Sequence, residues 1–160
     1  MPTHAPLLLP LTANREEFMR NLMILLLSGL SLNAIAADTE MTVYRSPTCG
    51  CCGKWIEHVK QNGFKVKDIV SDDMQAIKEK HGLPDKLASC HTAIVDGYVV
   101  EGHVPAGDIS KMLDNKSKVA GIAAPGMPMG SPGMEMGGQA DPYKVVSFDK
   151  EGKFEVFASH

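Results

Sequence analysis

Two hydrophobic spacings alternate along residues 41–113 of the chain. Short runs of β-branched and aromatic residues are typical of strands, whereas apolar residues three or four positions apart are typical of helices. The order of these segments is strand, helix, strand, helix, strand, strand, helix, and it predicts an α/β fold with a thioredoxin-like domain over residues 40–115. The predicted strands cover 41–45, 64–70, 92–95 and 98–101, and the predicted helices cover 54–62, 74–81 and 105–115.

The connections predict how these strands pair. The first two each contain a helix and are long enough for parallel crossovers. Asp96 and Gly97, in contrast, are a strong signal for a tight hairpin turn. We therefore expect the last two strands of the domain to be antiparallel.

The chain changes character after residue 115. Residues 116–142 are rich in Gly, Pro, Ala and Met and have no apolar period, which predicts a Met-rich flexible loop. Residues 143–158 alternate apolar and polar positions around a polar turn at 149–152, which predicts a C-terminal β-hairpin. This hairpin is expected to cover or extend the sheet.

The N-terminal part of the chain shows the pattern of a secretory signal. Arg15 and Arg20 precede a mainly apolar stretch at 22–32, and small residues spaced as a signal peptidase requires come next. Because a membrane span needs roughly 20 apolar residues, we predict a cleaved signal peptide over 1–36 and no stable membrane anchor; an uncleaved anchor is the alternative. The prolines and acidic residues near the start favour Met19 as the true first residue.

Composition narrows the classes of function. The 160 residues are 44% hydrophobic and 22% charged, with a formal net charge of −3. Nucleic-acid binding needs a clustered basic surface, which this slightly acidic chain lacks, so no nucleic-acid partner is expected. The chain that remains after signal removal is long enough to bury a core without disulfides, so its four cysteines are available for chemistry.

The densest chemical signal is a cysteine cluster between the first strand and the first helix. Cys49 and Cys52 form a C-x-x-C pair, and Cys51 adds a third sulfur. A helix N-terminus favours the thiolate, which is both a nucleophile and a soft metal ligand. The cluster therefore suits disulfide exchange, with Cys49 attacking and Cys52 resolving, or binding of Cu(I) or Zn(II). A structural disulfide with one spare thiol is the remaining interpretation.

A fourth sulfur is predicted to face this cluster. Cys90 and His91 precede the third predicted strand, where thioredoxin-like chains usually carry a cis-proline before a residue such as Thr92. An imidazole in place of that proline disfavours a general disulfide reductase and favours a metal site with converging N and S ligands. The alternatives are a buried small side chain for Cys90 and a loop residue bonded to backbone for His91.

Further His and Met residues are candidate accessory ligands. Core packing does not explain four methionines in a Gly/Pro-rich loop, and thioether sulfur suits Cu(I); a linker that tolerates Met is the alternative. His103 is placed to approach the site from the start of the last helix, whereas His58 is expected to be solvated. The accessory candidates are His91, His103, Met127, Met129, Met134 and Met136.

The chain also carries three specific motifs, CGCC, SCHT and GHVP, within the runs YRSPTCGCCGKWIEHVKQNGF and SCHTAIVDGYVVEGHVPAGDI. These runs resemble the DUF411 family of small exported proteins, which includes the copper-resistance proteins called CopG. The resemblance implies a thioredoxin-like fold, a periplasmic location and copper binding through Cys49, Cys51, Cys52 and Cys90. It also implies a role beside copper exporters and multicopper oxidases.

Together these patterns predict a periplasmic copper-binding protein of copper resistance or homeostasis that holds Cu(I) through clustered thiolates, with copper redox activity left open. One alternative is a thiol–disulfide oxidoreductase that uses Cys49 and Cys52. The other is a zinc-binding interaction module. Thioether ligands favour Cu(I), because zinc gains nothing from Met.

Overall fold

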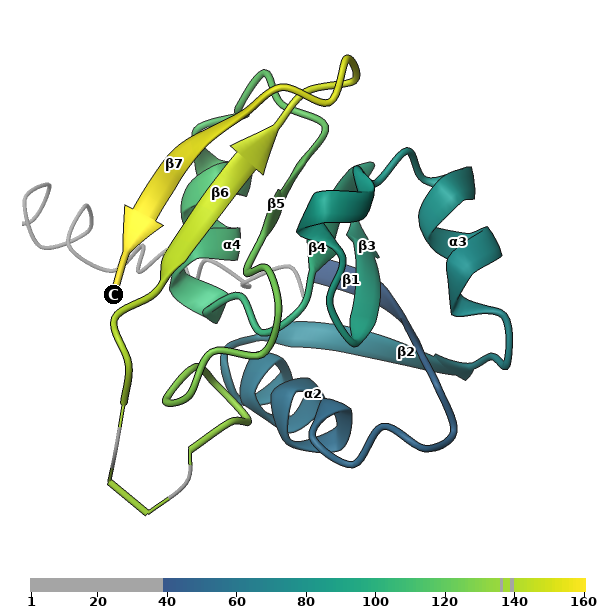
Figure 1. Cartoon of the computed structure of the whole chain (residues 1–160), viewed down its shortest axis with the longest axis vertical. Coiled ribbons are helices and arrows are strands. Elements are labelled where there is room, and N and C mark those ends of the chain that lie inside the picture. Colours follow the sequence, from purple (N-terminus) through teal and green to yellow (C-terminus); the bar gives the residue numbers. More distant parts are fainter. Residues whose placement is uncertain (1–38, 136, 139) are drawn as a thin grey trace, which may run out of the picture. The chain divides into compact units, whose positions relative to one another are not determined.

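The computed structural model describes residues 39–135, 137–138 and 140–160. The predicted signal peptide and Met136 lie outside these residues. Within these residues, seven strands form one mixed sheet in the order β2-β1-β3-β4-β5-β6-β7, and three α-helices and one 3-10 turn accompany it (Figure 1). The elements are β1 (Thr39–Arg45), α2 (Cys52–Gln61), β2 (Phe64–Val70), α3 (Met74–Lys80), η1 (Asp85–Leu87), β3 (His91–Val95), β4 (Tyr98–Glu101), α4 (Ala106–Asp114), β5 (Gly121–Ala123), β6 (Lys144–Phe148) and β7 (Phe154–Ser159).

The predicted α/β fold and the order of its elements up to α4 are confirmed. β1 pairs in parallel with β2, as expected from the first crossover connection, but antiparallel with β3, so the second connection is not the parallel crossover that we expected. The β3–β4 hairpin turns at Asp96 and Gly97, whose φ angles of 46° and 81° are those that a tight hairpin turn requires. The register of β1 against β3 places Arg45 opposite His91, so the end of β1 lies beside the start of β3.

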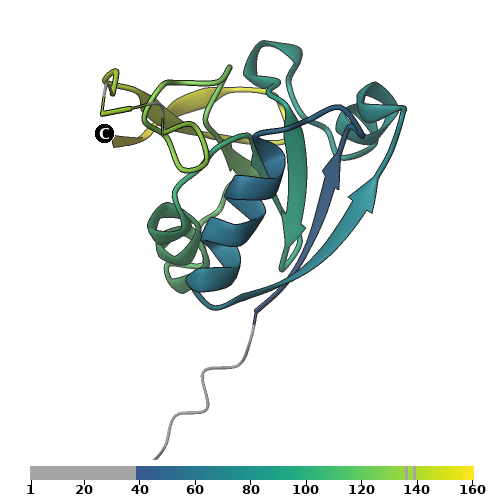
Figure 2. The ribbon, with the colours of Figure 1, turned by 90° about the horizontal axis from the view of Figure 1, so that it is seen from below.

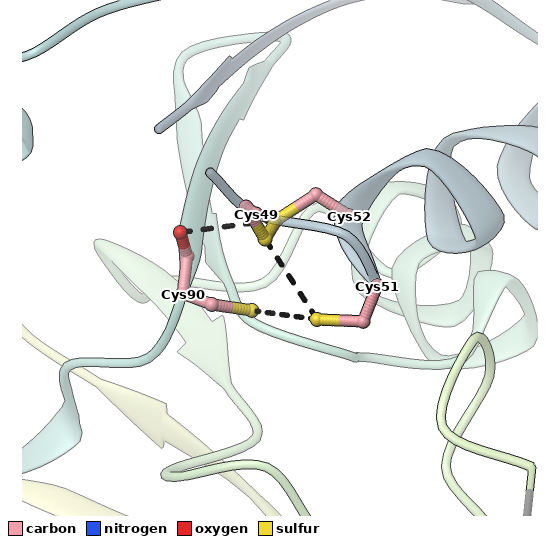
Figure 3. Close-up of side chains that lie close together, drawn as sticks. All are labelled: Cys49, Cys51, Cys52 and Cys90. Atoms are coloured by element: carbon pink, nitrogen blue, oxygen red, sulfur yellow. Dashed lines mark hydrogen bonds between the residues drawn. A yellow bond between two sulfur atoms is a disulfide. The ribbon is translucent and has the colours of Figure 1, made fainter. Parts of the chain in front are cut away.

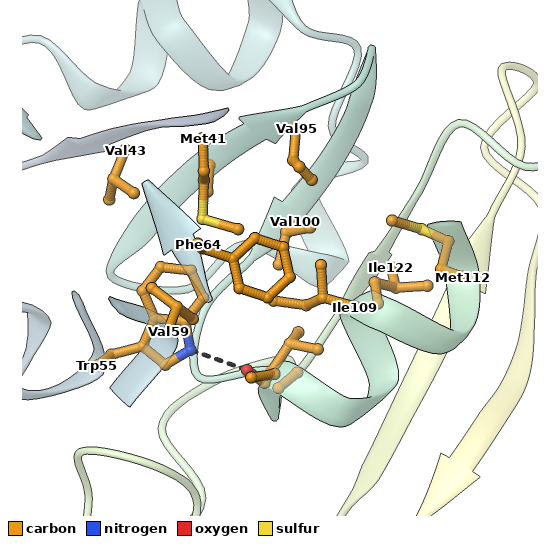
Figure 4. Packing of buried hydrophobic residues seen from close by; sticks show 14 of the residues in the cluster. Met41, Val43, Trp55, Val59, Phe64, Val95, Val100, Ile109, Met112 and Ile122 are labelled. Atoms are coloured by element: carbon orange, nitrogen blue, oxygen red, sulfur yellow. Dashed lines mark hydrogen bonds between the residues drawn. The ribbon is translucent and has the colours of Figure 1, made fainter. Parts of the chain in front are cut away.

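Helices α2 and α4 cover one face of the sheet and enclose the larger core (Figures 2 and 4). Trp55 and Val59 of α2 and Ile109 of α4 pack in this core with inward-facing strand residues such as Val43. The fully buried indole of Trp55 donates a hydrogen bond to the Val104 carbonyl at 2.8 Å. This bond fixes the first turn of α2, which begins at Cys52 of the cysteine cluster, against the segment that leads into α4.

A smaller core occupies the opposite face of the sheet. Leu83 and Leu87, from the segment between α3 and β3, pack with Val99, Ala123 and Phe148. Successive residues of a strand point to opposite faces, so Val99 belongs to this smaller core while its neighbour in β4 belongs to the larger one. The sheet is thus buried on both faces around β3 and β4.

The predicted flexible loop at 116–142 contains a strand, so that part of the prediction is wrong. β5 pairs in parallel with β4 and antiparallel with β6, and all three of its residues are buried. A Cβ atom at Gly121 would overlap the Val99 carbonyl, so only glycine allows the two backbones to approach this closely. A strand of three small residues gives no period that sequence reasoning can detect.

The predicted C-terminal hairpin is present as β6 and β7, and it extends the sheet beyond β5. Phe148 and Val145 of β6 are buried, whereas Phe154 and Val156 of β7 are exposed. Within the described residues, none of the helices combines the length and the apolar character that crossing a membrane requires.

Candidate metal centre

The four cysteines come from two segments that the sheet brings together. Cys49 and Cys51 lie in the turn after β1, and Cys52 is the first residue of α2. Cys90 directly precedes β3, and the β1–β3 register places this point beside the end of β1. The pairing of β1 with β3 therefore brings residues that are 38 to 41 positions apart in sequence into one site.

The ligand atoms of all four cysteines lie within 4.8 Å of one another (Figure 3). A disulfide joins Cys49 and Cys52, and Cys51 and Cys90 are free thiols. The Cys51 sulfur lies 3.7 Å from the Cys49 sulfur and 3.9 Å from the Cys90 sulfur. The predicted convergence of the cysteines is therefore present in the structure, with one pair in the oxidised form.

Burial controls the protonation of Cys90. It raises the pKa of this thiol to about 12, and the neighbouring Cys51 sulfur acts in the same direction. Without a metal, Cys90 is therefore a thiol at neutral pH. A metal that binds its sulfur must displace the proton, so metal binding releases protons from this site.

Two histidines complete a second group of donor atoms with Cys90. His103 places its Nε2 atom 3.1 Å from the Cys90 sulfur, and His91 places its Nδ1 atom 3.3 Å from the same sulfur. Both side chains are fully buried, and their rings meet edge to face. The positions predicted for His91 and His103 thus converge on Cys90.

Both imidazoles are held in the form that binds metals. Burial lowers the pKa of His91 well below its usual value, and the neighbouring His103 and Lys78 side chains lower it further. Burial also lowers the pKa of His103, although its bond to the Pro132 carbonyl partly offsets this. Neutral imidazole has a free lone pair, so both rings are available as ligands at neutral pH.

The tautomer of His103 follows from its neighbours. Its Nδ1 atom lies 2.8 Å from the Pro132 carbonyl oxygen, which can only accept a hydrogen bond. Nδ1 therefore carries the proton, and the lone pair of Nε2 faces the Cys90 sulfur. A backbone carbonyl on the far nitrogen is the usual support of a histidine that binds a metal.

His91 keeps one buried nitrogen without a partner. Its Nε2 atom has no hydrogen-bond partner within the part of the chain that the structure describes. The ring packs at 4.3 Å, centroid to centroid, against Trp55. An unpartnered buried polar atom costs free energy, so its presence here is consistent with a role in ligand binding.

The Met-rich segment lies against this site through a tight turn. Gly133 is buried with a φ of 85°. A Cβ atom there would come within 2.8 Å of the backbone nitrogen of Trp55 and 3.3 Å of the Cys51 carbonyl oxygen. Ser131 is fully buried and its hydroxyl donates to the Pro128 carbonyl. Sequence reasoning missed the contribution of Pro132, because a backbone carbonyl leaves no signature in the sequence.

The methionines of this segment differ in exposure. Met127 is 57% exposed, while Met129 and Met134 are partly buried. Met136 lies outside the described residues. His58, which we expected to be solvated, is partly buried instead, and its Nε2 atom accepts a hydrogen bond from the Ala106 N–H at 3.1 Å.

Comparison with known proteins places this site in a family. A family model described as "Protein of unknown function, DUF411" matches residues 87–134. Two solved structures, "Copper resistance protein copG- Form 1" and its Form 2, share 49% and 48% sequence identity with the chain at a TM-score of 0.73 each. The matches cover 77% and 76% of this chain and 98% of each solved chain. The chain belongs to the DUF411/CopG-like family.

The DUF411 segment of the chain holds one half of the site. It contains Cys90, His91 and His103 together with the Pro132 turn, and it begins after the CGCC turn. The two CopG structures extend the likeness to most of the chain. No curated protein matches the chain. In this DUF411 member the four cysteine sulfurs form one group of donor atoms, and Cys90 forms a second group with His91 and His103. A cysteine cluster of this kind, once its disulfide is reduced, is able to bind a soft metal ion.

Proposed function

We propose that this protein binds copper in the periplasm as part of copper resistance and that it holds Cu(I) through Cys49, Cys51, Cys52 and Cys90. The observation that carries the proposal is the convergence of these four sulfurs within 4.8 Å. The relatives named copper resistance protein CopG support copper as the metal. Thiolate ligands favour Cu(I), the softer oxidation state.

Use of all four sulfurs requires reduction of the Cys49–Cys52 disulfide. In this step an external dithiol reductant supplies two electrons and two protons, the S–S bond breaks, and the reductant is oxidised to its own disulfide; the two protons then leave the cysteines when copper binds. With the disulfide intact, Cys51, Cys90 and the two histidines still offer a smaller donor set. We therefore expect the reduced protein to hold copper more tightly than the oxidised protein.

The secretory signal predicted at 1–36 supports the periplasmic part of the proposal. Copper exporters and multicopper oxidases of the periplasm are the protein partners that we propose. The methionines of the segment after β5, with Met127 exposed, would collect Cu(I) near the cysteines.

A competition titration tests the proposed ligands. Cu(I) affinity is measured without oxygen against a chromogenic Cu(I) chelator, using the reduced protein and its C51S and C90S variants. Each variant loses one sulfur of the site, so we expect its Cu(I) affinity to fall by roughly 100-fold. Mutating a residue that only supports a metal ligand typically lowers metal affinity by about 10- to 100-fold, and loss of the ligand itself should cost at least the upper value.

The matched control is H81Q, which removes a histidine outside the donor groups. We expect H81Q to bind Cu(I) like the wild type. Wild-type affinity in both cysteine variants, or no copper bound by the reduced wild type, would contradict the proposal. Zinc recovered with the protein in place of copper would favour the zinc-binding module.

The disulfide itself favours one alternative function. Cys49 and Cys52 form the oxidised C-x-x-C pair of a thiol–disulfide oxidoreductase at the start of α2. Such an enzyme needs only these two residues, so C51S and C90S should both keep reductase activity towards insulin. Retained reductase activity together with absent copper binding would establish the oxidoreductase and reject the copper site.

A further inference from the structure

A buried polar cluster lies directly behind the turn that carries Cys90. Its centre is Glu101, the last residue of β4, whose side chain has 0% exposure. Lys78 of α3 and Thr92 of β3 are buried beside it. Sequence reasoning did not single out these residues, because a charged residue at the end of a strand is usually solvated.

Every oxygen of the Glu101 carboxylate has a partner. Oε1 accepts hydrogen bonds from Lys78 Nζ at 2.5 Å and from the Ser89 backbone N–H at 2.5 Å. Oε2 accepts a hydrogen bond from the Thr92 hydroxyl at 2.7 Å. Lys78 Nζ also donates to the Thr92 hydroxyl at 3.0 Å. The carboxylate thus connects a helix, two strands and the Cys90 turn.

Stability alone does not account for this arrangement. The desolvation of two buried charges usually offsets their attraction, and apolar residues of similar size are often equally stable in such places. The carboxylate also orients the backbone before Cys90, because Ser89 immediately precedes Cys90 and its N–H donates to Oε1. The ion pair therefore fixes the backbone from which the Cys90 sulfur projects.

The other side of the same turn is fixed by close backbone contacts. A Cβ atom at Gly102 would come within 2.6 Å of the Ser89 Oγ and 2.7 Å of the Ala124 carbonyl oxygen, so glycine is required there. The Ser89 hydroxyl donates a hydrogen bond to the Gly126 carbonyl. The Cys90 turn is therefore held between the Glu101 carboxylate and the segment after β5.

We propose that Glu101, held by Lys78 and Thr92, is the positioning residue for the Cys90 sulfur in the metal centre. The inference rests on the proposed copper function for its role, but its geometry can be tested without copper. Cys90 lies 3.9 Å from the Cys51 sulfur and 3.1 Å from His103 Nε2. Metal ligands must stay close to their productive geometry, so a shift of the turn separates Cys90 from both partners.

The test uses E101Q and T92V in the full exported protein, with two measurements on each. In the metal-free protein with its disulfide intact, the rates of alkylation of Cys90 and Cys51 by N-ethylmaleimide are compared by peptide mass spectrometry. We expect the ratio of the Cys90 rate to the Cys51 rate to rise roughly fivefold as the turn opens locally. In the reduced protein, we expect Cu(I) affinity to fall by about tenfold or more.

The control for lost stability is I109V, which trims a buried core residue of α4 away from the turn. It should lower the free energy of unfolding and leave both the alkylation ratio and the copper affinity unchanged. If E101Q does not fold, T92V carries the same test, because it removes the hydroxyl that donates to Oε2 and accepts from Lys78 Nζ but leaves the carboxylate in place. An unchanged alkylation ratio in folded variants, or an equal change in I109V, would overturn the positioning role. If the wild type binds no copper, the proposed function fails, and the alkylation ratio still decides the role of Glu101.

Discussion

Binding at this site depends on individual ligand atoms, and backbone groups orient these atoms. The Pro132 carbonyl fixes the proton of His103 on Nδ1, which leaves Nε2 facing the Cys90 sulfur. The neighbouring Gly133 allows the Pro132 carbonyl to come close to His103, because a residue without a side chain can pack directly on the backbone nitrogen of Trp55. A residue that contains no ligand atom is therefore expected to control a ligand.

The variant G133A tests this dependence. Its methyl group would collide with backbone atoms of Trp55 and Cys51, and alanine disfavours a φ of 85°. We expect the free energy of unfolding to fall by about 1–3 kcal/mol and Cu(I) affinity to weaken as Pro132 leaves His103. Urea unfolding and chelator competition measure the two effects.

Gly137 provides the matched control, because it has a φ of 66° and open space around its Cα. G137A should carry the backbone strain alone and should keep wild-type copper affinity. Equal copper affinities in G133A and G137A would show that the turn does not support His103.

Helices and strands with a recognisable pattern of apolar residues could be predicted from sequence. A strand that forms only through pairing with its neighbours could not. The β-branched and aromatic residues of β6 and the Asp96–Gly97 turn identify their elements locally. β5 exists only because β4 and β6 pair with it, so its three small residues gave no signal. The same distinction holds in the site: the strand order placed Cys90 beside the CGCC turn, whereas the support of His103 comes from a carbonyl in a segment predicted to be a loop.

The Met-rich segment after β5 is expected to deliver copper to the cysteines, and its four methionines can be tested together. Replacing Met127, Met129, Met134 and Met136 together by Leu keeps side-chain bulk and removes only the sulfur atoms. A tethered segment raises the local ligand concentration to roughly millimolar without adding tight binding. We therefore expect unchanged folding, and either slower copper acquisition or fewer copper ions per chain.

Stopped-flow loading and a stoichiometric titration measure these two quantities. The thiolates should still set the equilibrium affinity, so chelator competition at low copper should match the wild type. If loading rate and stoichiometry both equal those of the wild type, the segment is a passive connection and its methionines do not handle copper.

At the scale of the whole molecule, the two helices on one face of the sheet are joined by a titratable contact. His58 of α2 accepts the N–H of Ala106, the first residue of α4, through its Nε2 atom. That N–H has no acceptor within its own helix, so the imidazole replaces a capping side chain. Protonation of Nε2 would remove the acceptor, and the start of α4 would lose this hydrogen bond to α2.

This contact predicts how the stability of the metal-free protein depends on pH. Burial lowers the pKa of four histidines below the usual 6.5, so the unfolded chain binds more protons than the folded chain as pH falls below that value; the four are His58, His81, His91 and His103. Stability is therefore fully present above pH 6.5 and decreases at lower pH, by up to about 1.4 kcal/mol per pH unit for each proton taken up.

Urea unfolding at pH 7.5 and at pH 5.5 should show this loss, and H58Q should reduce it, because glutamine does not titrate and its side-chain oxygen can still accept the Ala106 N–H. The same loss in H58Q as in the wild type would show that the helix contact does not sense pH.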